Sequence, residues 1–207
     1  MLEVQRRRLQ YDSQQRAWDV VAEYFQLFRS GVGNATEQRP TGTNEVLCTT
    51  EAQQQLMFLR STMASNVEFG RGDLIGVEAL MGHWQRLSEC HDGLHVQMEY
   101  LNKISDTIVI ATATMSVTIT KNTLEGIFPH LMGSESVEDL SLAVRLLGHR
   151  LSYPCSTLFV WDEASSLVVR LETDVDMATP LLKLLGNLDE VSRVLDGAVV
   201  FAQHDTC

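Results

Sequence analysis

Two side chains have the chemistry to act together in proton transfer, Tyr24 and Asp73. A tyrosine hydroxyl can donate a hydrogen bond to a ligand oxygen, and a carboxylate can act as a general base. Each also has a simpler interpretation. Tyr24 would be a core tyrosine whose hydroxyl reaches a backbone carbonyl, and Asp73 would serve the turn that contains Gly70 and Gly72. The sequence leaves both interpretations open.

The histidines do not have the spacing of a metal site. His91 and His95 are four residues apart but flank Gly93, where we expect a strand to begin rather than a helix face. His83 stands beside Trp84 and is expected on an exposed face of its helix. The sequence contains no GxSxG, Walker or GxGxxG motif. We therefore expect no metal, no cofactor and no catalytic residue, with Tyr24 and Asp73 as the alternative catalytic pair.

Large apolar side chains from several expected elements could line a pocket for a hydrophobic small molecule. They are Tyr24, Phe28, Phe58, Met63, Trp84, Met98, Met115 and Trp161. The same side chains could equally fill a solid core, because protein interiors are packed as densely as organic crystals. Spacing does not separate these two interpretations, so both remain open.

The residues from 107 to 120 form the element that must position the others. Their sequence, TIVIATATMSVTIT, alternates apolar with hydroxyl-bearing side chains from Ala111 to Thr120. This period of two predicts one long strand with an apolar face and a hydroxyl face. Small Ala111 and Ala113 leave room on the apolar face for a helix or a ligand. The opposite face either packs against a partner in a dimer or faces water, and it includes Thr112, Thr114 and Thr118.

Helical periodicity predicts most of the remaining elements. An apolar stripe predicts a helix over 18–28, and two further helical stripes follow before residue 90. Alternation then predicts a strand that enters the long one through a hairpin loop over 102–106. We expect an irregular segment over 121–135 and a helix that begins after Ser136. The side chains of that helix expected to face inward are Leu140, Val144 and Leu147.

The order of these elements predicts an α+β fold, because helices and long antiparallel strands are segregated along the chain. We expect an antiparallel sheet with a helical insertion and C-terminal helices, and the resemblance described below implies that this sheet is cone-shaped and curved around the N-terminal helices. Residues 17–200 would form this single domain, and 201–207 a tail. Residues 1–16 are expected to form a helical lead-in in which Leu2 and Leu9 have the spacing of a coiled-coil heptad.

The composition is that of an acidic globular protein. The formal net charge of −11 at pH 7 argues against a broad basic surface for nucleic acid. The four cysteines contain no CxxC pair, which fits a reducing compartment. No apolar run reaches the roughly 18 residues of a membrane helix, and no secretory signal is recognisable. We expect an intracellular chain without membrane or direct nucleic-acid contacts.

The stretch FLRSTMASNVEF, followed by GVEALMGHW and the long strands, resembles the nuclear-transport-factor-two superfamily. That superfamily includes ketosteroid-isomerase-like and SnoaL-like domains, in which a curved sheet wraps around the first helix and encloses a pocket. The resemblance covers roughly residues 17–185 and implies the cone fold. It also implies an alternative function, a small-molecule isomerase, cyclase or dehydratase that uses Tyr24 with an acidic partner such as Asp73.

A more specific resemblance is carried by WDVVAEYFQLFRSG, QQQLMFLRSTMASNVEFG and TATMSVTITKNTLEGIFPHL. These stretches resemble the region after the zipper in oomycete basic-leucine-zipper (bZIP) transcription factors. The resemblance implies a non-catalytic domain for dimerisation or small-molecule sensing, located in the nucleus. It makes residues 1–16 the end of a zipper helix. It also implies a homodimer, or a heterodimer with another bZIP-type protein. The sequence shows no basic region with the Asn and Arg spacing that contacts DNA.

Overall fold

The computed structural model describes residues 2–32, 51–70, 74–133 and 136–199, with side chains from residue 15 onward. These residues form a six-stranded sheet with the strand order β2-β1-β6-β5-β4-β3. The strands are β1 (Met63–Phe69), β2 (Leu74–Ile75), β3 (Asp92–Ser105), β4 (Ile108–Thr118), β5 (Arg150–Trp161) and β6 (Val168–Val175). The helices are α1 (Leu2–Leu27), α2 (Glu51–Thr62), α3 (Val77–Cys90), α4 (Lys121–Ile127), α5 (Pro129–Gly133), α6 (Val137–Leu146), α7 (Ala178–Leu185) and α8 (Leu188–Leu195).

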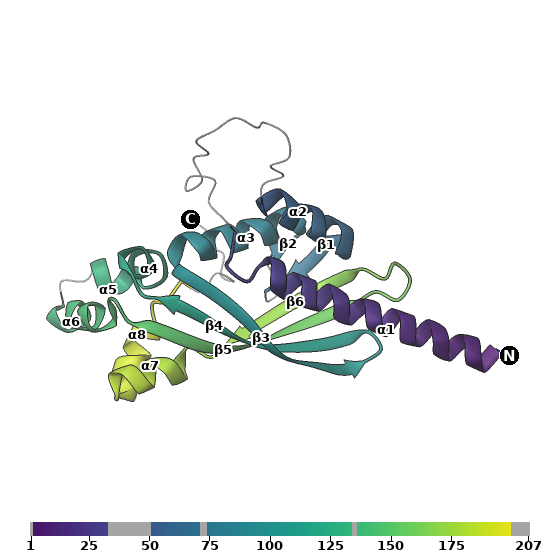
Figure 1. Ribbon diagram of the computed structural model, residues 1–207. Coiled ribbons are helices and arrows are strands. Elements are labelled where there is room, and N and C mark those ends of the chain that lie inside the picture. Colours follow the sequence, from purple (N-terminus) through teal and green to yellow (C-terminus); the bar gives the residue numbers. More distant parts are fainter. Residues whose placement is uncertain (1, 33–50, 71–73, 134–135, 200–207) are drawn as a thin grey trace, which may run out of the picture.

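The helices form three groups around a curved sheet (Figure 1). Helices α1, α2 and α3 lie along one face of the sheet, α4 to α6 are inserted between β4 and β5, and α7 and α8 follow β6. This arrangement confirms the predicted α+β class, with its helical insertion and C-terminal helices. One strand pair, β1 with β6, is parallel, so the sheet is mixed rather than wholly antiparallel.

Helix α1 is continuous from Leu2 to Leu27, so the predicted lead-in and the predicted helix over 18–28 form one element. Its N-terminal half extends beyond the sheet in Figure 1. Its C-terminal half packs on the sheet through buried Val21, Tyr24 and Phe25. Trp18, which the stripe also placed inward, is 37% exposed. The side chains of Leu2 and Leu9 lie outside the described part of the chain, as does Asp73.

Strand β4 shows the alternation predicted for it. The apolar side chains of one face are buried, namely Val109, Ala111, Ala113 and Val117. The hydroxyl face is half-buried and carries Thr112, Thr114, Ser116 and Thr118. On this face Thr114 Oγ1 donates to Glu99 Oε1 at 2.6 Å, and the hydroxyls of Ser116 and Ser152 are 2.9 Å apart. Part of the hydroxyl face is therefore occupied by hydrogen bonds between side chains of neighbouring strands. The role of this face in a dimer stays a prediction.

Two predicted loops are wrong. Strand β3 runs to Ser105, which pairs with Ile108, so the hairpin turns at Asp106 and Thr107 and not over 102–106. The segment expected to be irregular contains α4 and α5. Helix α4 begins after Thr120, whose side chain and backbone exchange hydrogen bonds with Thr123 in a capping box. This hydrogen-bonded start compensates for the weak periodicity of so short a helix.

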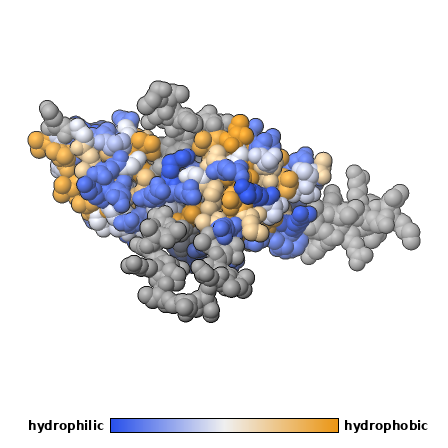
Figure 2. Space-filling view, turned by 90° about the horizontal axis from the view of Figure 1, so that it is seen from above, coloured by the Kyte–Doolittle hydropathy of each residue, from blue (hydrophilic) through white to orange (hydrophobic). Residues whose placement is uncertain are grey.

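Helix α6 has the opposite orientation from the one predicted. Its buried residues are Leu142, Ala143 and Leu146. Val144, expected inside, is 72% exposed. Both faces of this helix are apolar, so periodicity alone did not choose between them. Figure 2 shows hydrophobic side chains at the end of the molecule where α5 and α6 lie. The exposed ones are Met132, Val137, Leu140, Val144 and Leu147.

Candidate functional site

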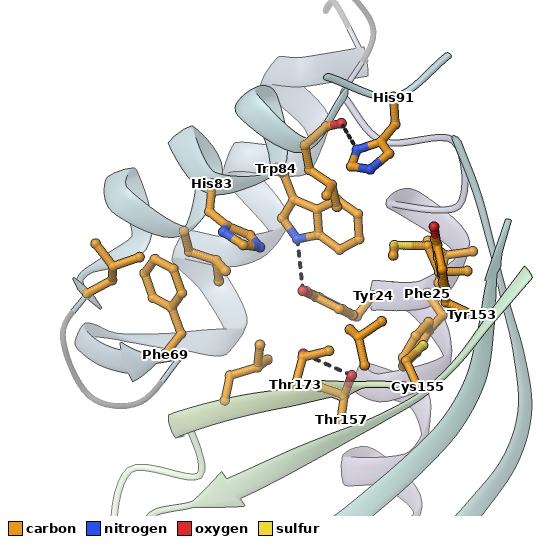
Figure 3. A pocket seen from close by; sticks show the side chains of 18 of the residues that line it. Tyr24, Phe25, Phe69, His83, Trp84, His91, Tyr153, Cys155, Thr157 and Thr173 are labelled. Carbon is orange, nitrogen blue, oxygen red and sulfur yellow. Dashed lines mark hydrogen bonds between the residues drawn. The ribbon is translucent and has the colours of Figure 1, made fainter. Parts of the chain in front are cut away.

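A cavity of about 160 Å³ lies between the helices and the inner face of the sheet (Figure 3). Its walls come from helices α1, α3 and α4 and from all six strands, and most of its lining side chains are apolar or aromatic. Among the described lining residues there is no Lys, Arg, Asp or Glu. The cavity can therefore hold an uncharged molecule with little desolvation cost, whereas a charged one would lack a partner.

The strand register sets the order of side chains on the cavity floor. Val96, Met115 and Tyr153 stand side by side on β3, β4 and β5. The next inward position of β5 is Cys155, which pairs with Val175 of β6. Because inward positions recur at every second residue, these neighbouring side chains form one continuous surface under the helices.

Tyr24 and Trp84 form the upper wall of the cavity. Trp84 Nε1 donates a hydrogen bond to the Tyr24 hydroxyl at 2.9 Å. The indole also stacks on Phe28, with ring centroids 5.0 Å apart. Burial raises the pKa of Tyr24 well above its ordinary value, and the bond from Trp84 offsets this only in part. Tyr24 therefore stays protonated at neutral pH and presents a neutral hydroxyl.

Tyr153 reaches the cavity from the sheet and is 1% exposed. Its hydroxyl makes no hydrogen bond to any described residue. Burial raises the pKa of Tyr153, so this hydroxyl also stays protonated. In Figure 3 it points toward the side of the cavity where His91 lies. A buried hydroxyl without a partner is costly, so it marks a place where a ligand atom would be stabilising.

Two histidines line the cavity, and the prediction of a surface position for His83 is wrong. His83 is half-buried, and its ring lies edge-on to Phe69 of β1 at a centroid distance of 5.8 Å. His91 is buried, and its Nδ1 lies 3.0 Å from the carbonyl oxygen of Leu87. Burial lowers the pKa of His91. This imidazole is therefore neutral at pH 7.

Two further polar groups of the floor bond within the protein. The hydroxyls of Thr157 and Thr173 are 3.1 Å apart. The Cys155 thiol donates to the carbonyl oxygen of Ala113 at 3.3 Å, and burial raises the pKa of Cys155 to about 11. A thiol with so high a pKa is a poor nucleophile at neutral pH. These groups contribute to the shape of the cavity more than to any reaction.

The structure separates the residues predicted for the pocket. Tyr24, Trp84 and Met115 line the cavity. The others pack elsewhere in or against the core and are Phe28, Phe58, Met63, Met98 and Trp161. Sequence reasoning missed Tyr153 and His91 as lining residues. The alternation of β5 placed Tyr153 on the inward face, and that was the signal available.

No group of three His, Cys, Asp or Glu within the described residues could hold a metal ion. Asp73, the predicted general base, lies outside the described residues, so its position relative to Tyr24 stays a prediction. None of the described helices is both long and apolar enough to cross a membrane.

Residues 18–90 match the family model of the BZIP transcription factor 1 C-terminal domain. This match confirms the resemblance seen in the sequence, and it covers α1 from Trp18, α2, β1, β2 and α3. It therefore includes the Tyr24 and Trp84 wall of the cavity. No curated protein matches the chain.

Solved structures with a similar fold include SnoaL-like and ketosteroid-isomerase-like proteins. A SnoaL-like protein from Jannaschia sp. CCS1 is 18% identical, with a TM-score of 0.44 over 70% of this chain and 81% of that chain. A SnoaL-like polyketide cyclase from Agrobacterium tumefaciens is 14% identical, with a TM-score of 0.45 over 65% and 88%. A protein with a ketosteroid-isomerase-like fold from Catenulispora acidiphila, solved with trimethylamine, is 14% identical, with a TM-score of 0.41 over 65% and 85%.

Proposed function

We propose that the chain is a non-catalytic, small-molecule-sensing domain of a bZIP-like transcription regulator that acts in the nucleus. The match of residues 18–90 supports the association with transcription factors. The single observation that carries the sensing role is the apolar cavity under α1 and α3. The Tyr24 hydroxyl in its wall accepts a hydrogen bond from Trp84, and no described Asp or Glu lines the cavity with it. We infer that this site binds its ligand without catalysing a reaction.

The sensing role is tested with toluene as a neutral one-ring probe and thermal unfolding as the measurement. At ten times its Kd, toluene should raise the Tm of the chain by about 3–5 °C, because a ligand that binds only the folded state stabilises it. A Val175→Phe variant fills the cavity from β6 and should lose the shift. An equal shift in both proteins would mean that toluene binds elsewhere and would overturn the proposal.

The alternative, an isomerase, cyclase or dehydratase that uses Tyr24 and Asp73, makes a different prediction. A Tyr24→Phe variant removes the hydroxyl that an enzyme would need for proton transfer. Under the sensing role this variant keeps most of its affinity for toluene, because the phenyl ring still forms the wall. Loss of turnover of a cyclic ketone substrate in this variant, where the unaltered chain shows such turnover, would favour the enzyme.

Dimerisation through α1 is a second candidate role. The helix is 26 residues long and its N-terminal half extends beyond the sheet, as the end of a zipper would. If Leu2 and Leu9 lie in such an interface, a Leu2→Asp/Leu9→Asp variant should shift a dimer to monomer. Sedimentation velocity measures the mass, and a Thr112→Ala/Thr114→Ala variant tests the alternative interface on the hydroxyl face of β4. A monomer at all concentrations would contradict both interfaces.

A further inference from the structure

We propose that the cavity selects a neutral molecule the size of a single substituted ring, which carries an oxygen that accepts a hydrogen bond from the Tyr153 hydroxyl. This inference rests on the proposed sensing function and adds the chemical class of the ligand. It is carried by three features of the cavity: its volume, the absence of charge from its described walls, and the unpartnered hydroxyl of Tyr153.

The volume limits the size of the ligand. The cavity measures about 160 Å³. An engineered apolar protein cavity of about 150 Å³ binds benzene. The sites of drug-sized ligands have volumes of roughly 300–1,000 Å³. One ring with a short substituent therefore fits this cavity as it stands, whereas a fused polycyclic skeleton does not.

The walls favour a flat aromatic ring over a chain. Aromatic side chains surround the cavity, with Tyr24, Phe25 and Trp84 on the helices and Phe69 on β1. These rings already meet one another edge to face, as in the Tyr24 and Trp84 pair at 6.0 Å. A ligand ring can join this arrangement at ordinary aromatic distances. Met115 and Met177 line the cavity as well, and thioethers pack well on ring edges.

The Tyr153 hydroxyl specifies the polar atom of the ligand. A phenolic hydroxyl has one hydrogen to donate, and no described residue accepts it from Tyr153. A carbonyl, ether or hydroxyl oxygen of the ligand would accept that hydrogen and remove the cost of an unmade bond. The Tyr24 hydroxyl accepts a hydrogen bond from Trp84, and no described residue accepts its own hydrogen, so it adds a second donor. Both tyrosines therefore favour a ligand acceptor.

The charge of the cavity selects against ionised ligands. No described Lys or Arg lines it to pair with a carboxylate or phosphate, and no described Asp or Glu lines it to pair with an amine. The buried imidazole of His91 is held neutral, since burial lowers its pKa. A ketone, phenol or aromatic ether satisfies these conditions, and the corresponding acid or amine does not.

The experiment compares two isosteric probes, acetophenone and α-methylstyrene, which differ only in a carbonyl oxygen and a methylene group. Their Kd values are measured by titration calorimetry on the 207-residue chain and on a Tyr153→Phe variant. The ratio of the acetophenone Kd to the α-methylstyrene Kd should rise about fivefold to tenfold in the variant, because only the ketone loses a hydrogen bond. Tyr100→Phe, a variant of a tyrosine that is 65% exposed, is the matched control and should leave the ratio unchanged.

Each outcome decides between the inference and the function on which it rests. If both probes bind and the ratio does not change in Tyr153→Phe, the Tyr153 inference is wrong while the sensing cavity stands. If neither probe binds the unaltered chain, the sensing function fails and the inference with it. The infrared carbonyl stretch of bound acetophenone gives a readout that needs no variant. It should move to lower frequency than in hexane, and an unshifted band would overturn the proposal.

Discussion

Tyr24 and Tyr153 line the same cavity, one from helix α1 and the other from strand β5. Both are almost fully buried, and burial raises the pKa of each. The Tyr24 hydroxyl accepts a hydrogen bond from Trp84, whereas the Tyr153 hydroxyl has no partner among the described residues. Burial alone does not distinguish the roles of the two tyrosines, but their hydrogen bonding does. Tyr24 stabilises the wall of the cavity through its bond with Trp84, whereas Tyr153 lowers the stability of the ligand-free protein.

Truncating a side chain beside Tyr24 should lower the free energy of unfolding more than any change at Tyr153. A Trp84→Ala variant removes the buried indole that stacks on Phe28 and bonds to Tyr24. Its free energy of unfolding should fall by about 3–5 kcal/mol, as for other buried aromatic residues cut to alanine. Urea denaturation followed by circular dichroism measures the change. Trp18→Ala, at the exposed position on α1, is the control, and equal losses in the two variants would contradict this structure.

Removing only the hydroxyl of Tyr24 should have a smaller effect of the same sign. In Tyr24→Phe the ring stays, but the buried Trp84 N–H loses its acceptor. The cost of leaving a buried donor unsatisfied is about 1–3 kcal/mol. The same urea titration measures it, with Tyr100→Phe as the exposed control. A variant as stable as the unaltered chain would show that the Trp84 N–H finds another acceptor.

His91, which lines the cavity near Tyr153, should make the stability of the protein depend on pH. Burial lowers the pKa of His91 in the folded state, so the unfolded chain takes up a proton at a higher pH than the folded one. Stability is therefore complete above the ordinary histidine pKa of about 6.5 and is lost as pH falls below it. The loss from this residue has a slope of at most about 1.4 kcal/mol per pH unit.

A His91→Gln variant should lose that slope when urea denaturation is repeated between pH 5 and pH 8. His149→Gln, at an exposed position, controls for the removal of a histidine. If the His91→Gln variant keeps the full pH dependence of the unaltered chain, another group is responsible for it.

The smallest expected change is a gain in stability, at Tyr153, and it tests the difference between the two tyrosines most directly. Tyr153→Phe removes a buried hydroxyl that has no described partner. The free energy of unfolding should rise by about 0.5–1 kcal/mol, because burying a hydroxyl without a hydrogen bond is unfavourable. Urea denaturation of Tyr153→Phe beside Tyr24→Phe gives the contrast. A loss at both positions would mean that Tyr153 has a partner in the protein, and the two tyrosines would then be alike.

The parts of this fold that the sequence predicts are those with a single apolar face. From Ala111 to Thr118, strand β4 has only one apolar face, and its buried residues follow that pattern. Helix α6 has apolar residues on both faces, so Leu142 and Leu146 compete with Leu140 and Val144 for the inward position. The face that is buried depends on the elements against which α6 packs, and these are distant in the sequence.

The candidate site was predictable only in part, for a similar reason. Trp84 was recognisable as a large residue on an inward stripe and Tyr24 as one beside such a stripe, but no spacing shows that Trp84 donates a hydrogen bond to Tyr24. The inward position of Tyr153 followed from alternation, whereas its lack of a partner depends on every element around it. His83 was expected on the surface because its helix turns it away from Trp84. The ring of Phe69 from β1 covers that side.

The continuity of α1 has a mechanical consequence. Tyr24 stands near the C-terminal end of a single helix that begins at Leu2. With a rise of about 1.5 Å per residue, a tilt of roughly 5° at Tyr24 moves the far end by about 3 Å. Because the helix is continuous, a small rotation at the end that lines the cavity becomes a larger displacement at Leu2. A ligand that moves the ring of Tyr24 by a fraction of an ångström and tilts the helix would displace its N-terminal end, together with any protein bound there.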